Sequence, residues 1–234
     1  MNPVCVYQII PDRDQDCQPY INIMKKYISK FHYLTQDLPH RSHVEQAEIA
    51  CKAGANWLQY RCFSKTDEEM IQELHQVASV CDDWGTTLIL TDHYHLLDQV
   101  DAQGVHLEDM QADFKKIREI ISYEKTLGAS ANTFEDIQRI FLSGVVDYIG
   151  CGPFSLTKTK PNDFPLLGIN GYAERIAKMI DSGFEIPVLA VGGIKVEDTL
   201  PLLNTGIHGI AVSSAVNLAE NPGDAFRDFY KKIY

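Results

Sequence analysis

The feature that most constrains this chain is a regular alternation of short apolar segments with longer amphipathic ones. From residue 31 onward, eight short apolar segments have the length and composition of buried strands. The predicted strands are residues 31–35, 57–61, 87–91, 104–107, 126–129, 148–151, 187–191 and 209–212. The segments between them carry apolar residues at three- and four-residue spacings, as in Met70, Leu74, Val77 and Cys81, which predicts helices.

The predicted helices are residues 42–53, 67–84, 112–122, 133–142, 171–181, 196–204 and 222–230. Thr66 precedes one of them and Glu69 follows three residues later, an arrangement that satisfies free N–H groups at a helix start. Strand–helix alternation with short connectors implies parallel strands joined by right-handed crossovers. Eight such units fit a closed barrel better than an open sheet. We therefore predict an α/β fold, a (β/α)8 TIM barrel.

The domain organisation follows from where this rhythm begins. Residues 28–234 form the predicted single barrel domain, a common size for this fold. Residues 1–27 lie outside the repeat and are predicted to be an N-terminal extension, to which the sequence assigns no function.

Charge and cysteine usage limit the classes of partner. The formal net charge of −11 argues against nucleic acid or an anionic membrane as partner, since both favour a basic surface. It does not argue against phosphorylated small molecules, for which a few local cations suffice. The six cysteines contain no CxxC pair, which favours reduced thiols over a disulfide framework or a zinc site. No membrane-length apolar run or signal segment is evident, so we expect a cytoplasmic protein.

The loop after the sixth predicted strand is the clearest functional signal. The segment GCGPFSLTKTKP, residues 150–161, places Thr157, Thr159 and Lys160 beyond the strand's carboxyl end. Hydroxyl, ammonium and backbone N–H groups gathered there favour phosphate or pyrophosphate binding over a plain surface turn. In a barrel of this type, the active site lies at that end of the strands.

The other predicted strands end in residues that suggest two anion sites. Gly192–Gly193 and Ser213–Ser214 follow strands seven and eight, the usual position of a barrel phosphate site. The second site combines two cations, Arg61 and Lys160, with the carboxylates of Asp92 and Asp109. Carboxylates beside a polyanion are best explained by a Mg²⁺ ion between them.

Each residue also has a structural interpretation. Arg61 could instead pair with a neighbouring acid, and Asp92 could cap a helix. His106 is expected to be a packed barrel residue, and His93 and His95 to be surface groups or to support the site from behind. The convergence of the whole set at one barrel end favours the functional interpretation.

Eight sequence pieces together resemble the thiamine phosphate synthase family. They are HYLTQD, AGANWLQYR, LILTDH, GVHLEDM, LGASANT, DYIGCGPFSLTKTKP, IPVLAVGGI and GIHGIAVSSAV, spanning residues 32 to about 216. The TxTKP loop is the most specific of them.

The resemblance implies a transferase that joins hydroxymethylpyrimidine pyrophosphate to thiazole phosphate, giving thiamine monophosphate and pyrophosphate with Mg²⁺. It implies a dissociative mechanism, in which Lys160, Ser130 and Arg61 act on the reacting groups. The implied metal ligands are Asp92 and Asp109. The implied substrate-binding residues are Gln59, Arg61, Thr91, Ser130, Thr157, Thr159, Lys160, Gly193, Ser213 and Ser214. Family members suggest a homodimer.

Three departures from the family pattern affect the pyrophosphate site. Phe63 stands where the family motif Gln-x-Arg-x-Lys has lysine, and Lys65 is the candidate replacement. Thr91 precedes Asp92 where the family has Asn-Asp. The segment GVHLEDM is about two residues short, so Glu108 could replace Asp109. The alternatives are therefore a related thiazole tautomerase, which needs neither pyrophosphate nor Mg²⁺, and a non-catalytic sensor of a phosphorylated ligand.

Overall fold

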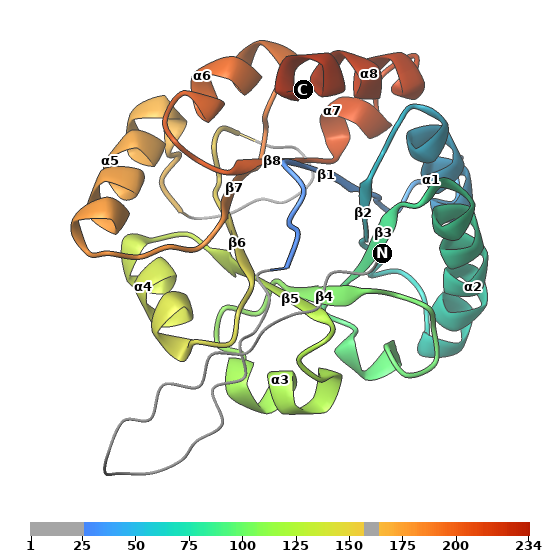
Figure 1. Cartoon of the computed structure of the whole chain (residues 1–234). Coiled ribbons are helices and arrows are strands. Elements are labelled where there is room, and N and C mark those ends of the chain that lie inside the picture. Colours follow the sequence, from blue (N-terminus) through green and yellow to red (C-terminus); the bar gives the residue numbers. More distant parts are fainter. Residues whose placement is uncertain (1–25, 157–163) are drawn as a thin grey trace, which may run out of the picture.

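The computed structural model describes residues 26–156 and 164–234, and within them eight parallel strands close into a barrel (Figure 1). Each strand pairs with its neighbours in chain order, and β1 closes the barrel by pairing with β8. The strands are β1 (Phe31–Leu34), β2 (Trp57–Tyr60), β3 (Thr87–Thr91), β4 (Gly104–Leu107), β5 (Thr126–Ala131), β6 (Tyr148–Cys151), β7 (Val188–Val191) and β8 (Gly209–Val212). The predicted TIM barrel is confirmed.

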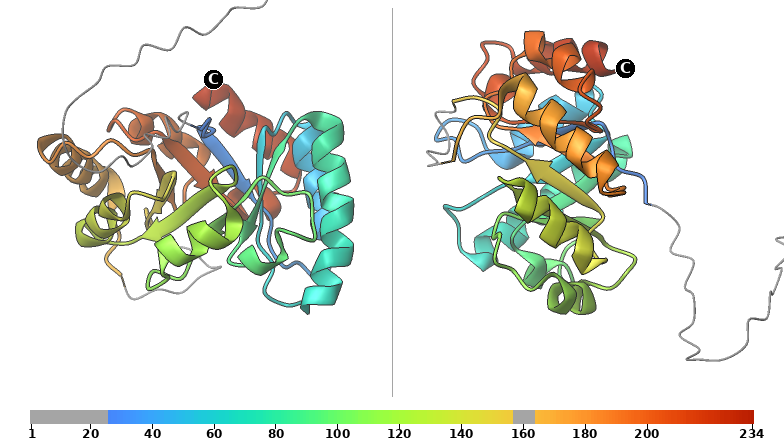
Figure 2. Two further views of the ribbon diagram at one scale, coloured as in Figure 1. Left: turned by 60° about the horizontal axis from the view of Figure 1, so that its bottom comes forward. Right: turned by 90° about the vertical axis from the view of Figure 1, so that its left-hand side faces the viewer.

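Helices surround the barrel, as the side views show (Figure 2). They are α1 (His43–Lys52), α2 (Asp67–Trp84), α3 (Phe114–Ile121), α4 (Phe134–Ser143), α5 (Gly168–Asp181), α6 (Thr199–Leu203), α7 (Ser214–Asn217) and α8 (Pro222–Ile233), with the 3-10 turns η1 (Tyr94–Leu96) and η2 (Val196–Asp198). The predicted capping box at Thr66 and Glu69 opens α2. No helix of the described residues has both the length and the apolar character of a membrane span.

The third unit has no α-helix after its strand, in agreement with the predicted helices, none of which lies between residues 91 and 104. Only the turn η1 lies between β3 and β4, because the connecting residues 92–103 are too few to hold a full helix and its turns. The predicted helix 196–204 is also divided into η2 and α6. The short connection after β3 brings Asp92 and His93 directly onto the rim of the barrel.

Large side chains close the barrel interior at the end where the strands begin. Trp57, Ile89, Tyr148 and Leu189 form one buried cluster with Ile28, which precedes β1. A second, larger cluster fills the layer between strands and helices. Because this floor is packed, the only open end for ligands in the described part of the barrel is the one where the strands' carboxyl ends meet. The boundary predicted at residue 27 stays a prediction, since residues 1–25 lie outside the described residues.

Candidate active site

A pocket of about 280 Å³ opens at the carboxyl ends of the strands. Its polar side chains come from several strands: Gln59 from β2, His106 from β4 and Ser130 from β5, with Ser213 directly after β8. The lining residues include Gln59, Arg61, His106, Glu108, Ser130, Gly193, Ser213 and Ser214. Six of the predicted site residues, Gln59, Arg61, Ser130, Gly193, Ser213 and Ser214, are thus brought together in one cavity.

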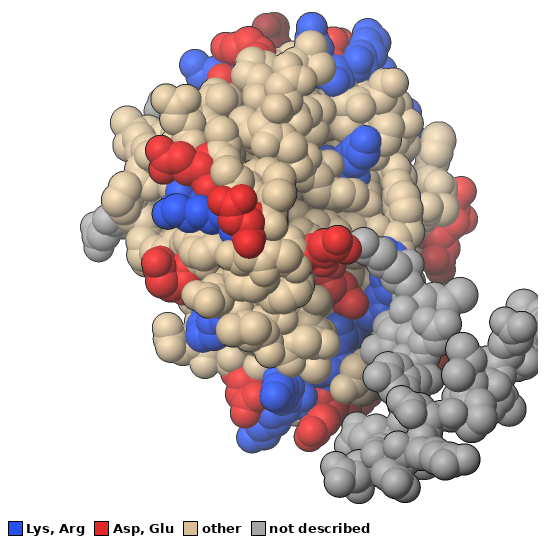
Figure 3. All heavy atoms as spheres, turned by 60° about the vertical axis from the view of Figure 1, so that its left-hand side comes forward, with Lys and Arg blue, Asp and Glu red and all other residues tan. Residues whose placement is uncertain are grey.

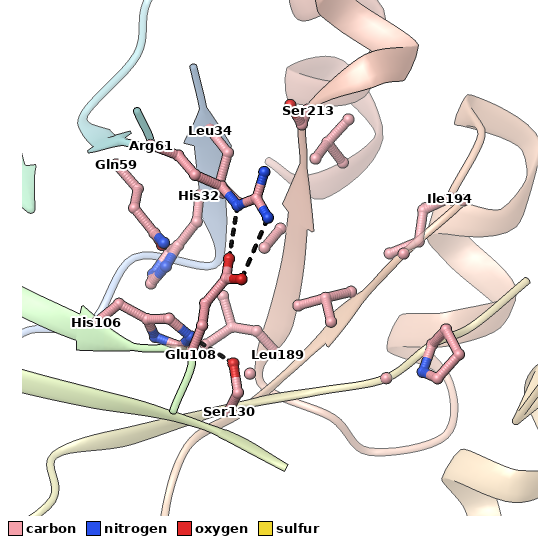
Figure 4. A pocket seen from close by; sticks show the side chains of 18 of the residues that line it. His32, Leu34, Gln59, Arg61, His106, Glu108, Ser130, Leu189, Ile194 and Ser213 are labelled. Atoms are coloured by element: carbon pink, nitrogen blue, oxygen red, sulfur yellow. Dashed lines mark hydrogen bonds and ion pairs between the residues drawn. The ribbon is translucent and has the colours of Figure 1, made fainter. Parts of the chain in front are cut away.

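Arg61 and Glu108 form a two-pronged ion pair across this pocket (Figure 4). Arg61 Nε donates to Glu108 Oε1 at 2.6 Å, and the Arg61 Nη2 group donates to Oε2 at 3.2 Å. Both side chains are less than one-fifth exposed. Such a planar double contact is the geometry that a guanidinium also offers to phosphate. Of the lysines and arginines in the described residues, Arg61 alone lines the pocket.

Asp92 lies directly behind Glu108. Its Oδ1 accepts a hydrogen bond from the Glu108 backbone N–H at 2.6 Å, and its own backbone has a left-handed φ of 61°. Burial, followed by the nearby negative charge of Glu108, raises the pKa of the Asp92 carboxyl. The charge of the Glu108 carboxylate therefore disfavours the ionised form of Asp92.

Asp109 occupies a different position. It is exposed, its Oδ1 accepts from the Gln111 backbone N–H at 2.8 Å, and it does not line the pocket. The shortened segment therefore brings Glu108, rather than Asp109, beside Arg61.

Gln59 and Thr91 form a linked pair in the barrel wall. Gln59 lines the pocket, and its Nε2 donates to Thr91 Oγ1 at 2.8 Å. Thr91 is fully buried and does not line the cavity. Thr91 thus reaches the predicted site through Gln59.

Ser130 is joined to a buried histidine that we expected only to pack. His106 Nε2 lies 3.0 Å from Ser130 Oγ (Figure 4). Its Nδ1 lies 3.1 Å from the Tyr148 hydroxyl. His106 is nearly buried yet lines the pocket, so it is both a packing residue and a lining residue. Its position, alternating along β4 with outward-facing residues, was the available sequence signal.

His32 forms the floor beneath this pair. Its ring stacks on Trp57 with centroids 4.3 Å apart, and it meets the Tyr148 ring edge-on. Burial, then the neighbouring His106 and His208, hold the pKa of His32 well below its usual value. Within the described residues, His32 Nε2 has no hydrogen-bond partner. The floor is therefore a neutral, aromatic surface.

The part of the pocket lining that follows β7 and β8 has the shape of an anion cradle. Gly192 and Gly193 have left-handed φ values of 92° and 69°, and α7 begins next to them at Ser214. The Ser213 hydroxyl donates to Gln36 Oε1 at 3.1 Å, which fixes the turn after β8. Successive backbone N–H groups in such turns form concavities that bind anions.

Lys65, the candidate replacement for the family lysine, turns away from the pocket. Its Nζ lies 2.6 Å from Glu73 Oε2, and the same carboxylate accepts from the Tyr60 hydroxyl. Thr157, Thr159 and Lys160 lie outside the described residues.

Two further groups of possible metal ligands lie outside the pocket lining. They are Asp37, His43 and Cys62, and Asp67, His93 and His95. In the first, Asp37 Oδ1 already contacts His43 Nε2 at 3.1 Å and accepts from the Ser64 hydroxyl. In the second, His95 pairs with Asp67 on the surface. Neither group faces the cavity.

Comparison with known proteins adds a family to this geometry. The family model described as thiamine monophosphate synthase matches residues 33–216, which include every residue lining the pocket except His32. The chain belongs to this family. It is 36% identical over 208 residues to the thiamine-phosphate synthase of Flavobacterium johnsoniae, covering 88% of this chain and 97% of that protein. It is 36% identical over 181 residues to that of Phocaeicola vulgatus, covering 77% and 86%.

A solved structure agrees. The thiamine phosphate pyrophosphorylase of Pyrococcus furiosus superposes with a TM-score of 0.76 at 26% identity, covering 87% of this chain and 95% of that one.

Proposed function

We propose that this chain is a transferase that condenses hydroxymethylpyrimidine pyrophosphate with thiazole phosphate to thiamine monophosphate and pyrophosphate. Family membership and the names of the similar proteins support the proposal. The observation that carries it is the presence of two candidate anion-binding features in the lining of one cavity. Arg61 follows β2, whereas Gly193 follows β7, and Ser213 and Ser214 follow β8. A reaction between two phosphorylated substrates needs both.

The proposed chemistry is dissociative. The bond between the pyrimidine methylene carbon and the pyrophosphate oxygen breaks first, and the thiazole nitrogen then donates its lone pair to that carbon. Negative charge develops on the departing pyrophosphate, so a preorganised cation lowers the barrier. Arg61 supplies such a charge, and the resemblance gives Lys160 a similar role. The phosphate cradle holds the thiazole close to the carbon, which adds the advantage of proximity.

Gln59, Ser130 and the floor are proposed to orient the pyrimidine. Ser130 and His106 form a hydrogen-bonded pair that offers polar atoms at one edge of the cavity. His32 and Tyr148 supply the apolar surface beneath. An apolar pocket with a few directed polar groups suits a heteroaromatic ring.

The residues present fit a Mg²⁺ ion. Asp92 accepts from the Glu108 backbone N–H, the Glu108 carboxylate lines the pocket, and oxygen donors of this kind suit Mg²⁺. We propose these two as the ligands, with Asp109 as the sequence-based alternative. When bound, Mg²⁺ neutralises pyrophosphate charge. Glu108 would then release Arg61 for the substrate, because one carboxylate cannot serve both cations fully.

A thiazole tautomerase is the second candidate. The position of Lys65 favours it, since the lysine nearest to the family's position pairs with Glu73 instead of entering the pocket. A tautomerase needs the phosphate cradle but no pyrophosphate site.

The deciding experiment is an assay with purified full-length protein, the pyrimidine pyrophosphate, thiazole phosphate and Mg²⁺. We expect thiamine monophosphate to form and its formation to stop with chelator. Failure to form product, with the thiazole phosphate still bound, would favour the tautomerase or the sensor instead.

A further inference from the structure

We infer that Phe63 is a positioning residue, which orients Arg61 toward pyrophosphate by stacking on its guanidinium. The inference rests on the proposed function for the identity of the anion. The Arg61 Cζ atom lies 4.6 Å from the centre of the Phe63 ring. A guanidinium over an aromatic face is attracted by the ring's electrons and is held parallel or edge-on to it, whereas a flexible ammonium is not held in a plane.

The backbone that carries Phe63 is fixed independently of its side chain. The Phe63 N–H donates to Asp37 Oδ2 at 2.9 Å, and the Ser64 hydroxyl donates to Asp37 Oδ1, also at 2.9 Å. The Arg61 N–H donates to Thr35 Oγ1 at 3.1 Å. The segment after β2 is therefore tied to the segment after β1, so the ring is presented to Arg61 by a fixed support.

The contact between Phe63 and Arg61 matters because few cations of the described residues line this pocket. In the described residues, Arg61 is the one lysine or arginine among the lining residues, and Lys65 is held by Glu73. Where the family motif provides a second cation, this chain has an aromatic face. At this position the chain therefore lacks the positive charge of the family's lysine, and the ring instead orients the guanidinium of Arg61.

Glu108 and Phe63 hold Arg61 in complementary ways. Glu108 contacts the edge of the Arg61 guanidinium through two hydrogen bonds, and the guanidinium also lies over the Phe63 ring. When an incoming pyrophosphate competes with Glu108 for that edge, the ring contact can persist. Arg61 would then exchange one anion for another without losing its orientation.

The test compares Phe63→Leu, which keeps apolar volume but removes the ring, with Phe63→Tyr, which keeps it. Exposed cation–π contacts contribute about 0.5–1 kcal/mol, so we expect Phe63→Leu to raise KM for the pyrimidine pyrophosphate about two- to fivefold. KM for the thiazole phosphate should stay unchanged, and Phe63→Tyr should retain wild-type values. Tyr123→Leu, which removes an exposed ring stacked by Arg118 away from the pocket, is the matched control.

A double-mutant cycle shows whether Phe63 acts through Arg61. In an Arg61→Gln background, Phe63→Leu should cause no further change. Binding of inorganic pyrophosphate with Mg²⁺, measured by calorimetry, should show the same pattern without turnover. Pyrophosphate binding separates the role of Phe63 from the proposed transferase activity. If the wild type forms no thiamine monophosphate, only the proposed activity is contradicted, because binding still tests Phe63. Equal pyrophosphate affinity in wild type and Phe63→Leu, or an undiminished effect in the Arg61→Gln background, would overturn the role of Phe63.

Discussion

Glu108 has two competing partners in the proposed mechanism, and this gives its removal two effects of opposite sign. Glu108→Gln keeps the side-chain shape but removes the charge that pairs with Arg61 at 2.6 Å. Pyrophosphate without metal should bind about threefold more tightly, because Arg61 is no longer neutralised. The Mg²⁺ concentration that gives half-maximal activity should rise about tenfold or more, because a proposed ligand is lost.

The exposed neighbour provides the control for this pair of effects. Asp109→Asn removes the same charge one residue further on, outside the pocket. Calorimetry with pyrophosphate alone and a Mg²⁺ titration of activity measure both quantities. If Asp109→Asn, and not Glu108→Gln, changes the Mg²⁺ requirement, the sequence-based ligand is the correct one.

Asp92 illustrates a conflict between stability and function in a single residue. Burial, and then the charge of Glu108, raises the pKa of its carboxyl above 3.8 in the folded chain. A group with a raised folded pKa stabilises fully below its unfolded pKa and loses that stabilisation as the pH rises through the folded pKa. Asp92→Asn should therefore raise the Tm at pH 7, and the gain should shrink as the pH falls toward 4. The left-handed φ of 61° also suits asparagine.

The same substitution should lower activity. Asparagine can accept the Glu108 N–H bond but contributes no charge to a bound cation, so Mg²⁺ affinity should fall about tenfold or more. Thermal denaturation over a pH series and Mg²⁺ titrations check the two halves. A lower Tm at pH 7 would show that the ionised carboxylate stabilises the fold, contrary to this argument.

At the scale of elements, the turn after β7, which belongs to the proposed phosphate cradle, has a tightly packed backbone. A Cβ atom on Gly193 would lie 2.6 Å from the Leu156 carbonyl oxygen and closer still to Ser155 Oγ, and its φ of 69° is itself unfavourable for other residues. Gly193→Ala should therefore displace the turn and raise KM for thiazole phosphate about fivefold or more.

A matched glycine separates strain from function. Gly54 has a φ of 104°, and a Cβ there would meet no atom within 4 Å, far along the chain from the cradle. Gly54→Ala should lower the Tm while leaving both KM values unchanged. Steady-state kinetics with each substrate varied in turn provide the comparison; an unchanged thiazole phosphate KM in Gly193→Ala would exclude the turn from phosphate binding.

At the scale of the whole molecule, local pattern predicted the barrel, and contacts distant in sequence decided the details of the site. Apolar periodicity and capping residues such as Thr66 act within one element, so a single sequence reveals them. That Lys65 meets Glu73 depends on how the loop after β2 packs against α2, and no local pattern encodes that contact. Likewise, the pairing of Arg61 with Glu108 rather than with Asp109 depends on the length of the loop after β4 in the folded chain.

Charge is also distributed at this scale. Acidic and basic side chains are interspersed on the side of the molecule where α4 and α5 lie (Figure 3). The net charge of −11 is therefore compatible with the anion site proposed at Arg61. The proposed binding of phosphorylated substrates would depend on groups within the pocket, where solvent screening is weaker.

The buried floor of the barrel makes the stability of the molecule depend on pH. Burial, followed by His106 and His208, holds the pKa of His32 well below its usual value, so the folded chain keeps this ring neutral. As the pH falls below about 6.5, His32 of the unfolded chain binds a proton that the folded chain does not bind, and the free energy of unfolding decreases by up to about 1.4 kcal/mol per pH unit.

His32→Phe keeps a ring against Trp57 and removes this titration. Denaturant unfolding between pH 7 and 5 should therefore show a shallower loss of stability in His32→Phe than in wild type. Parallel slopes in His32→Phe and wild type would mean that another buried group, such as His43, whose pKa is also lowered by burial, governs the acid sensitivity of the barrel.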